Sequence, residues 1–337
     1  MSPHLFVPFP LPLLAQCGAQ QAHFQRRVQS LWSGYGAIER WRLEGGARAG
    51  QSVILKRIAP PTAAAHPRGW HSDLSHRRKL LSYQVESEFY RRYALRCEDT
   101  CRVPHCLGLD EQVGETRLLL EDLDAAGFSG RRLVDEADPS EAELGQCVEW
   151  LARFHARFLG GSSDGLWPIG TYWHLDTRPE EWAQMTDNRL QAAAAAIDAR
   201  LNGAQFQTLV HGDAKLANFC FRANSAHGPD GVAAVDFQYI GGGVGVKDLA
   251  YLLGSAYHGE ALAARTEHWL DCYMSCLRQA LKGRVESELD ALEREWRGLY
   301  PYAVADFERF LNGWAPGHWK VNGYTSETVQ HVLAQLS

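Results

Sequence analysis

The feature that most constrains what this chain can fold into is a polar loop at residues 210–218, followed by an acidic residue after one predicted hairpin. The loop has the sequence Val-His-Gly-Asp-Ala-Lys-Leu-Ala-Asn, so Asp213 precedes Asn218 by five residues, and Asp236 ends the second strand of the hairpin. Each of these residues alone is typical of a cap or a turn. The ordered set is much harder to obtain by chance, which favours a functional site.

Phosphoryl transfer from a nucleotide needs this set of oxygen atoms. A carboxylate orients and deprotonates the attacking hydroxyl group, and further oxygen ligands hold Mg²⁺ across the phosphates. Because Mg²⁺ prefers hard oxygen ligands, an amide oxygen and a carboxylate form a suitable partial site. We therefore predict Asp213 as the catalytic base and Asn218 and Asp236 as the metal ligands.

The same residues resemble the catalytic and metal-binding loops of the aminoglycoside phosphotransferase and choline kinase superfamily, which is related to the eukaryotic protein kinases. Lys215 is similar to the protein-kinase lysine that helps to neutralise the transferred phosphate, which implies a catalytic role. Asp248 matches a family aspartate that braces the catalytic loop. The motifs are closest to the ecdysteroid-kinase-like branch, most of whose members have no assigned substrate.

This resemblance implies an α+β, two-lobed protein-kinase-like fold, with ATP and Mg²⁺ as cofactors. We expect a nucleotide-binding lobe at 1–121, with an antiparallel sheet and one main helix, and a hinge at 122–127. A larger, mostly helical lobe at 128–337 would carry catalysis and the acceptor. The implied reaction moves the γ-phosphate of ATP to a hydroxyl of a small molecule. The alternative is an inactive nucleotide-binding scaffold of the same fold, and the choice between ATP and GTP stays open.

In the first lobe, the resemblance points to a lysine and a glutamate that bind the nucleotide together. Lys56 lies in the β-branched segment 52–58 and matches the strand lysine that contacts the α- and β-phosphates. Glu86 resembles the helix glutamate that pairs with this lysine. Glu88 is a rival on another face of the same helix.

Two further segments are assigned to the nucleotide by the same resemblance. Gly34 and Gly36 look like an abbreviated glycine loop, in which the third glycine of the full protein-kinase motif is missing. The segment 118–123 is similar to the hinge that receives adenine, through backbone groups of Glu121 and Leu123.

The local sequence pattern agrees with a sheet followed by helices. Strand character is found at 30–38 around a glycine turn, at 41–43, at 52–58, near Gly108 and at 116–120, with one helix at 82–95. The apolar stretch 5–14 lacks a basic region and contains three prolines, so we expect an extended segment packed on the first lobe and not an export signal. The later segments are a helix from 138 to 158, two strands at 219–222 and 232–237, a mobile segment at 241–245, and further helices.

The charge and the cysteine content of the chain limit the kinds of partner and metal that we expect it to bind. The net charge of -6 gives no reason to expect binding to nucleic acid or to a membrane surface. Cys97, Cys101 and Cys106 with His105 suggest a metal site, but the spacings of a zinc knuckle are missing, and free thiols in a reducing cytoplasm explain all eight cysteines. We therefore expect a cytoplasmic enzyme with a small hydroxylated substrate; the oligomeric state stays open.

The acceptor itself is not evident from the sequence, and aromatic residues of the second lobe are the candidates for its site. Aromatic rings attract a quaternary ammonium group, stack on a flat molecule, or simply fill a core. We predict that Trp173, together with Tyr172, contacts the acceptor. The other candidates are Trp167, His174, Trp182, Trp314, His318, Trp319 and Tyr324.

Overall fold

The computed structural model describes residues 8–31, 34–60, 73–97, 99–132, 139–222 and 231–336, in two compact units. The first unit contains the chain up to residue 95 together with 104–129, and the second contains 96–103 together with the chain from 130 onward. The hinge predicted at 122–127 stays a prediction. The sequence also predicts a loop rich in proline, alanine and histidine at 60–69 and a turn at 224–231, and both lie almost wholly outside the described residues.

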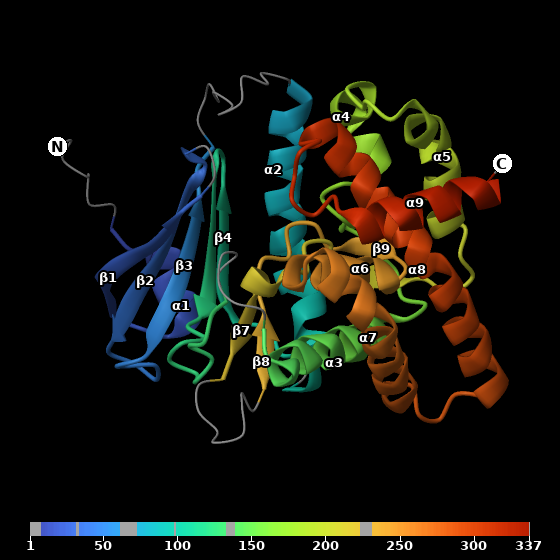
Figure 1. The fold of residues 1–337 in the computed structure, drawn as a ribbon. Helices are drawn as coiled ribbons and strands as arrows, with labels where there is room; N and C mark the ends of the chain where they lie inside the picture. The colour runs from blue at the N-terminus through green and yellow to red at the C-terminus, as the bar shows by residue number, and fades with distance from the viewer. Residues whose placement is uncertain are drawn as a thin grey trace. The chain divides into compact units, whose positions relative to one another are not determined.

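The first unit is built on a five-stranded antiparallel sheet with strand order β1-β2-β3-β5-β4 (Figure 1). The central strands β3 and β5 are the β-branched and leucine-rich segments that the sequence pattern predicts. Strand β1 is longer than predicted, because it begins at Gln21 and not at Ser30. The strands are β1 Gln21–Ser30, β2 Gly36–Glu44, β3 Ser52–Ile58, β4 Cys106–Gln112 and β5 Glu115–Glu121.

Two α-helices of the first unit are described, α1 (Leu11–Cys17) and α2 (Asp73–Glu88). Helix α1 starts after a proline and ends at Gly18, and it buries Leu13 in the core of the sheet. The predicted packing is confirmed at Leu13, but the predicted extended form is wrong from Leu11 onward, because prolines are well tolerated in the first turn of a helix. Helix α2 and the π-helical turn that follows it, Phe89–Tyr93, confirm the predicted main helix.

The second unit is mostly helical. Helix α3 begins with a capping box, in which the Ser140 hydroxyl accepts the Glu143 N–H and the Glu143 carboxylate accepts the Ser140 N–H. The predicted α+β class, with an antiparallel N-terminal sheet and a larger helical part, is confirmed. The helices are α3 Glu141–Phe158, α4 Pro179–Ala183, α5 Asn188–Asn202, α6 Val246–Ala256, α7 Gly259–Ala280, α8 Glu286–Trp314 and α9 Gly323–Leu336.

Two small antiparallel sheets in the second unit frame the polar loop. One pairs β6 (Thr208–Val210) with β9 (Gly241–Gly243), and the other pairs β7 (Phe219–Phe221) with β8 (Val232–Ala234). The prediction of a mobile segment at 241–245 is therefore wrong for residues 241–243, which form a paired strand. Gly241 lies so close to the Trp167 backbone that a Cβ atom would overlap it, and the glycines permit this tight pairing.

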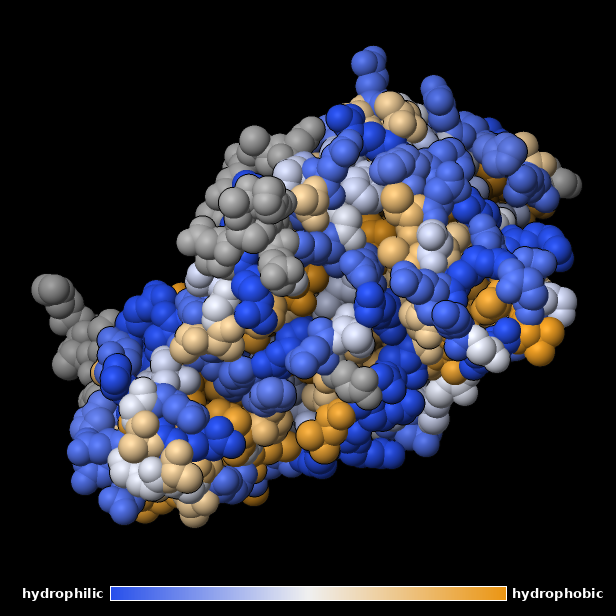
Figure 2. Space-filling view, turned by 90° about the horizontal axis from the view of Figure 1, so that it is seen from below, coloured by the Kyte–Doolittle hydropathy of each residue, from blue (hydrophilic) through white to orange (hydrophobic). Residues whose placement is uncertain are grey.

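The surface drawn in Figure 2 is mainly hydrophilic, with hydrophobic residues in small groups, as is usual for a folded protein. In the described part of the chain, no helix is both long and apolar enough to cross a membrane. None of the eight cysteines forms a disulfide bond. Among the described residues, no group of three or more His, Cys, Asp and Glu side chains is placed to hold a metal ion.

Candidate active site

The polar loop between β6 and β7 is held by a single buried carboxylate. Asp248, on α6, accepts the backbone N–H of His211 at 2.5 Å and that of Gly212 at 3.0 Å. Its Oδ2 also lies 3.1 Å from Nε2 of His155, on α3. Asp248 is fully buried, so these donors are its partners in place of water. The predicted bracing role of Asp248 is confirmed.

The side chain of His211 links the loop to the segment that carries the second aspartate. Its Nε2 lies 3.0 Å from the carbonyl oxygen of Val235, and its Nδ1 lies 3.2 Å from the backbone nitrogen of Asp213. The carbonyl can only accept and the backbone N–H can only donate, so the proton belongs on Nε2. A neutral imidazole in this tautomer joins the two halves of the site.

Asp213 is buried and its carboxylate is held at both oxygens. Oδ2 accepts hydrogen bonds from Nζ of Lys215 and from Nδ2 of Asn218, each at 3.0 Å. Oδ1 accepts one from the hydroxyl of Tyr251, at 3.1 Å. Because a carboxylate oxygen has two lone pairs, Oδ1 retains one position for a further proton donor. The carboxylate is thus oriented, with one acceptor position left over.

Asn218 and Asp236 are brought together by the β7–β8 hairpin. The hairpin pairs Phe219 with Ala234, and the N–H of Val235 donates to the carbonyl of Asn218 at 3.0 Å. The amide nitrogen of Asn218 is directed at Asp213, so its Oδ1 is the atom able to ligate a metal. Asp236 has a φ of 71°, a conformation that non-glycine residues rarely adopt. Two hard oxygen donors on a fixed turn fit Mg²⁺.

The charge of Lys215 is matched to this carboxylate environment. Burial would lower the pKa of its ammonium group, but the carboxylates of Asp213 and Asp236 raise it above the ordinary value of a lysine. The side chain therefore stays protonated, and it brings one positive charge to the oxygens of Asp213.

Tyr251 is the site residue that sequence reasoning missed. Its hydroxyl contacts Asp213, and lies 3.3 Å from the hydroxyl of Tyr172. Burial raises the pKa of the Tyr251 hydroxyl well above its usual value, so this group stays protonated as a donor. A pattern did exist, because Asp248 and Tyr251 are three residues apart and share one face of α6.

In the first unit, the structure pairs Lys56 with Glu86. Nζ of Lys56, on β3, lies 2.9 and 2.7 Å from the two carboxylate oxygens of Glu86, on α2, and both side chains are buried. The rival Glu88 pairs instead with Arg91 and Arg92. Of the two candidate glutamates, it is thus Glu86 that pairs with the strand lysine.

Gly34 and Gly36 form the turn between β1 and β2. The N–H of Gly34 donates to the carbonyl of Leu31 at 3.3 Å, and the N–H of Leu31 donates to the carbonyl of Gly36 at 2.8 Å. A Cβ atom on Gly36 would overlap the carbonyl oxygen of Arg57, so only glycine fits there. Tyr35, between the glycines, is buried. The described part of this turn is therefore anchored within its unit.

Glu121 and Leu123 lie at the end of β5, where a buried aspartate fixes the chain. Asp122 pairs with Arg40 and accepts the hydroxyl of Ser52 at 2.5 Å. The N–H of Glu121 donates to the carbonyl of His105, while that of Leu123 donates to none of the described residues. The Leu123 N–H therefore has no acceptor among the described residues, although the residue itself is buried.

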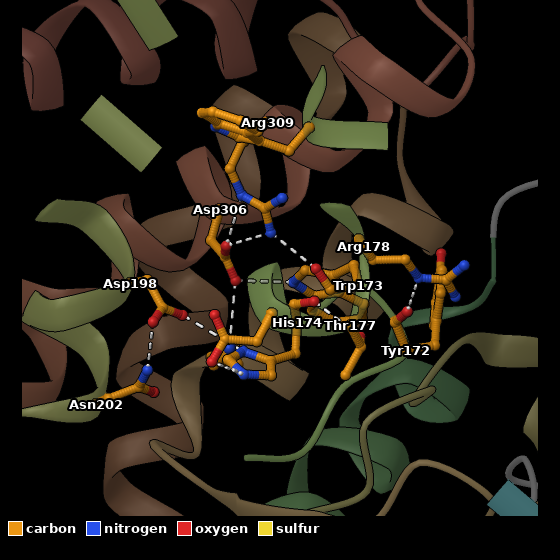
Figure 3. Close-up of polar contacts among 12 residues, drawn as sticks. Tyr172, Trp173, His174, Thr177, Arg178, Asp198, Asn202, Asp306 and Arg309 are labelled. Carbon is orange, nitrogen blue, oxygen red and sulfur yellow. Dashed lines mark hydrogen bonds and ion pairs between the residues drawn. The ribbon is translucent and has the colours of Figure 1, made fainter. Parts of the chain in front are cut away.

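The prediction that Trp173 contacts the acceptor is wrong, because this side chain is fully buried. Its indole N–H donates to Asp306 at 3.0 Å, and Arg309 donates to its carbonyl oxygen (Figure 3). Burial would raise the pKa of Asp306, but Lys247 and Arg309 lower it to about 2. Trp173 thus belongs to a buried ionic network of α6 and α8.

The other aromatic candidates divide by exposure. Trp167 and His174 are also buried, whereas Trp182 is 42% exposed, with its indole N–H on the carbonyl of Gln191. The later candidates Trp314, His318 and Trp319 are partly exposed, and their rings form a ladder that runs from the buried Phe310 to the exposed His258. Of the predicted aromatic residues, Trp182 and the outer members of this ladder are thus exposed in part, whereas Trp173 is not.

Comparison with known families supports the resemblance found from the motifs. The sequence profile of the ecdysteroid kinase-like family matches residues 171–284. This segment contains the polar loop, Asp236, Asp248 and Tyr251, so the predicted resemblance is confirmed over it. No curated protein matches the chain.

Solved structures of several small-molecule kinases are similar to this one. A choline kinase from Streptococcus pneumoniae is 11% identical, with 96% of each chain covered and a TM-score of 0.47. An amicoumacin kinase in complex with AMP-PNP, Ca²⁺ and Ami is 14% identical, with 96% of this chain and 90% of that chain covered and a TM-score of 0.46. An aminoglycoside-3′-phosphotransferase of type VIII is 16% identical, with 82% of this chain and 93% of that chain covered and a TM-score of 0.43. Because these TM-scores are below 0.5, the similarities carry no further argument.

Proposed function

We propose that this chain is a small-molecule kinase, which transfers the γ-phosphate of ATP to a hydroxyl group of its acceptor. The observation that carries this proposal is the carboxylate of Asp213, which is oriented by Tyr251, Lys215 and Asn218 and has one acceptor position left on Oδ1. The family profile that matches residues 171–284 supports the same class of activity.

In the proposed reaction, the acceptor hydroxyl donates to Oδ1 of Asp213, and its oxygen is thereby aligned with the γ-phosphorus. The new oxygen–phosphorus bond forms as the bond to the bridging β–γ oxygen breaks, the hydroxyl proton passes to Asp213, and ADP leaves. Lys215 supplies positive charge beside the transferred group. Asn218 and Asp236 would hold Mg²⁺, which when bound neutralises charge on the phosphates.

Residues of the first unit would hold the nucleotide. The Lys56–Glu86 pair would present an ammonium group to the α- and β-phosphates, and the N–H of Leu123, which has no acceptor among the described residues, would donate to the edge of a base, beside Glu121. Gly34 and Gly36 would lie over the phosphates, as the resemblance implies.

The test is Asp213→Asn, which keeps the shape of the side chain but cannot accept the hydroxyl proton. We expect turnover to fall by about 10²- to 10⁴-fold, with little change in ATP affinity, because this side chain faces the acceptor. Turnover is measured as ADP formation with a library of hydroxylated metabolites, and ATP affinity by calorimetry. Asp176→Asn, at a carboxylate that is 85% exposed, is the control.

Two results would contradict the proposal. Parent-like turnover in Asp213→Asn would remove the catalytic assignment. Binding of ATP without turnover of any compound in the parent protein would favour the inactive scaffold.

A further inference from the structure

Lys320 is a cation that lies beside the proposed site and, among the described residues, has no carboxylate partner. It lies in the loop between α8 and α9, and its Nζ lies 4.4 Å from the ring centre of Tyr251, 5.5 Å from that of Phe307 and 5.4 Å from that of Trp319. Within the described ranges, no Asp or Glu lies within ion-pair distance of Nζ. Aromatic faces attract the ammonium group, but they do not neutralise its charge.

The loop around Lys320 is held in place by its own hydrogen bonds. The backbone N–H of Lys320 donates to Nδ1 of His318, and its carbonyl accepts the side-chain amide of Asn322 at 3.0 Å. The N–H of Val321 donates to the carbonyl of His318 at 2.9 Å. The ammonium group is therefore carried by an ordered turn.

Tyr251 connects Lys320 to the base. One face of its ring is approached by Nζ of Lys320, and its hydroxyl donates to Oδ1 of Asp213. Asp213 and Lys215 both act on the charge of Lys320, the first by attraction and the second by repulsion. The ammonium group thus lies within one tyrosine side chain of the carboxylate that would receive the acceptor hydroxyl.

The ammonium group of Lys320 stays charged although burial disfavours its charged form. Burial lowers the pKa of its ammonium group to about 8, which still leaves it protonated at neutral pH. Glu308 lines the same mainly apolar pocket as Lys320, but its carboxylate contacts Ser326, and burial raises its pKa. A partly desolvated positive charge with no protein counter-ion gains most from an anion that binds next to it.

We propose that Lys320 recognises an anionic group of the acceptor, a carboxylate or a phosphate, next to the hydroxyl that Asp213 deprotonates. This inference rests on the proposed kinase function and specifies its substrate class. A cationic acceptor would meet Lys320 and Lys215 together and be repelled. Lys320 is thus assigned to specificity, and Asp213 to the chemistry.

The experiment compares acceptors that differ in one charge. The panel contains hydroxy acids with their primary amides, hydroxylated phosphate monoesters with their dephosphorylated forms, and amino alcohols. Turnover of each is measured with the parent, Lys320→Met, Lys320→Arg and the exposed-site control Lys282→Met. Binding of Mg-ATP is measured separately by calorimetry.

We expect the parent to prefer an acid or a phosphate over its neutral form by about tenfold or more in kcat/KM. Lys320→Met should abolish this preference through the acceptor KM, whereas Lys320→Arg and Lys282→Met should keep it. The preferred pair distinguishes a carboxylate from a phosphate. A folding defect would lower both members of a pair equally, so the selectivity ratio reports recognition alone.

Several outcomes overturn the inference. In the parent, these are a preference for an amide or an amino alcohol, or no turnover of any panel member although Mg-ATP binds. In Lys320→Met, they are an equal loss of kcat/KM for both members of a pair, or a raised KM for ATP. Preference for an amino alcohol would leave the kinase function standing. Failure to bind Mg-ATP at all would instead contradict the kinase function itself.

Discussion

Replacing Asp248 by asparagine should loosen the loop that carries the proposed base, and the size of the effect follows from the contacts. Oδ2 of Asp248 faces the N–H of His211 and the imidazole of His155, and Oδ1 faces the N–H of Gly212. An amide group placed in either orientation turns its NH₂ toward one of the two backbone N–H donors. His155 is able to adapt by changing its tautomer, but a backbone N–H is not.

At least one hydrogen bond to a charged acceptor is therefore lost in Asp248→Asn, and two donors are left facing each other. A bond of this kind contributes about 1.5–3 kcal/mol, so we expect the second unit to lose about 2–4 kcal/mol of its free energy of unfolding. Urea unfolding followed by tryptophan fluorescence measures this loss. Asp176→Asn, an isosteric change at an exposed carboxylate, should stay within about 0.5 kcal/mol of the parent.

The two units need not unfold together, so the loss is assigned to the unfolding transition that shifts in Asp248→Asn and does not shift in Asp176→Asn. A loss below about 1 kcal/mol in Asp248→Asn would refute the reasoning, because it would mean that the loop does not depend on this carboxylate.

The remaining predictions concern the metal, the nucleotide and the charge of Lys320. Asp236→Ala should reduce the gain in ATP affinity that Mg²⁺ brings, whereas Lys56→Met should weaken ATP binding in a way that excess Mg²⁺ does not restore. Calorimetric titration of ATP with and without Mg²⁺ distinguishes the two effects. An unchanged Mg²⁺ dependence in Asp236→Ala would place the metal elsewhere. Lys320→Met should be more stable than the parent at pH 7 by about 3 kcal/mol, because burial lowers the pKa of Lys320 from 10.5 to about 8, so that its charge opposes folding and does so fully below pH 8. This stability advantage should shrink as the pH rises from 8 toward 10.5, the ordinary pKa of lysine, because over this range Lys320 loses its charge in the folded protein while it keeps it in the unfolded chain. Urea unfolding of both proteins at pH 7 and pH 10 measures the advantage. An equal difference in stability at the two pH values would contradict the lowered pKa.

Much of the fold could be predicted from the sequence because local pattern and burial agree. Strand β3 is β-branched and lies in the middle of the sheet, and α3 combines a capping box with an apolar face. Prediction failed where tertiary contacts override local preference. The glycine strand β9 has no intrinsic tendency to be a strand, but its pairing with β6 and its close approach to Trp167 require it to be one.

In the site, residues close in sequence could be predicted and distant ones could not. Asp213, Asn218 and Asp236 lie on one loop and its hairpin, so their order alone suggests that they meet. Tyr251 reaches Asp213 from another helix, and Lys320 reaches Tyr251 from a turn near the end of the chain. The same absence of contact information placed Trp173 at the acceptor, although its indole N–H is used by the buried Asp306.

The surroundings of Asp213 combine features that do not favour stability. Asp236 has a left-handed φ, and Lys320 has a charge with no counter-ion among the described residues. Each is costly by itself, since strained backbone and unpaired buried charge both oppose folding. A core built for stability alone would replace them, as the expected gain in Lys320→Met illustrates. Their concentration around one carboxylate, in a unit otherwise braced by paired groups such as Asp306 with Arg309, is what a ligand-binding centre requires: its charges find their partners only when the substrates bind.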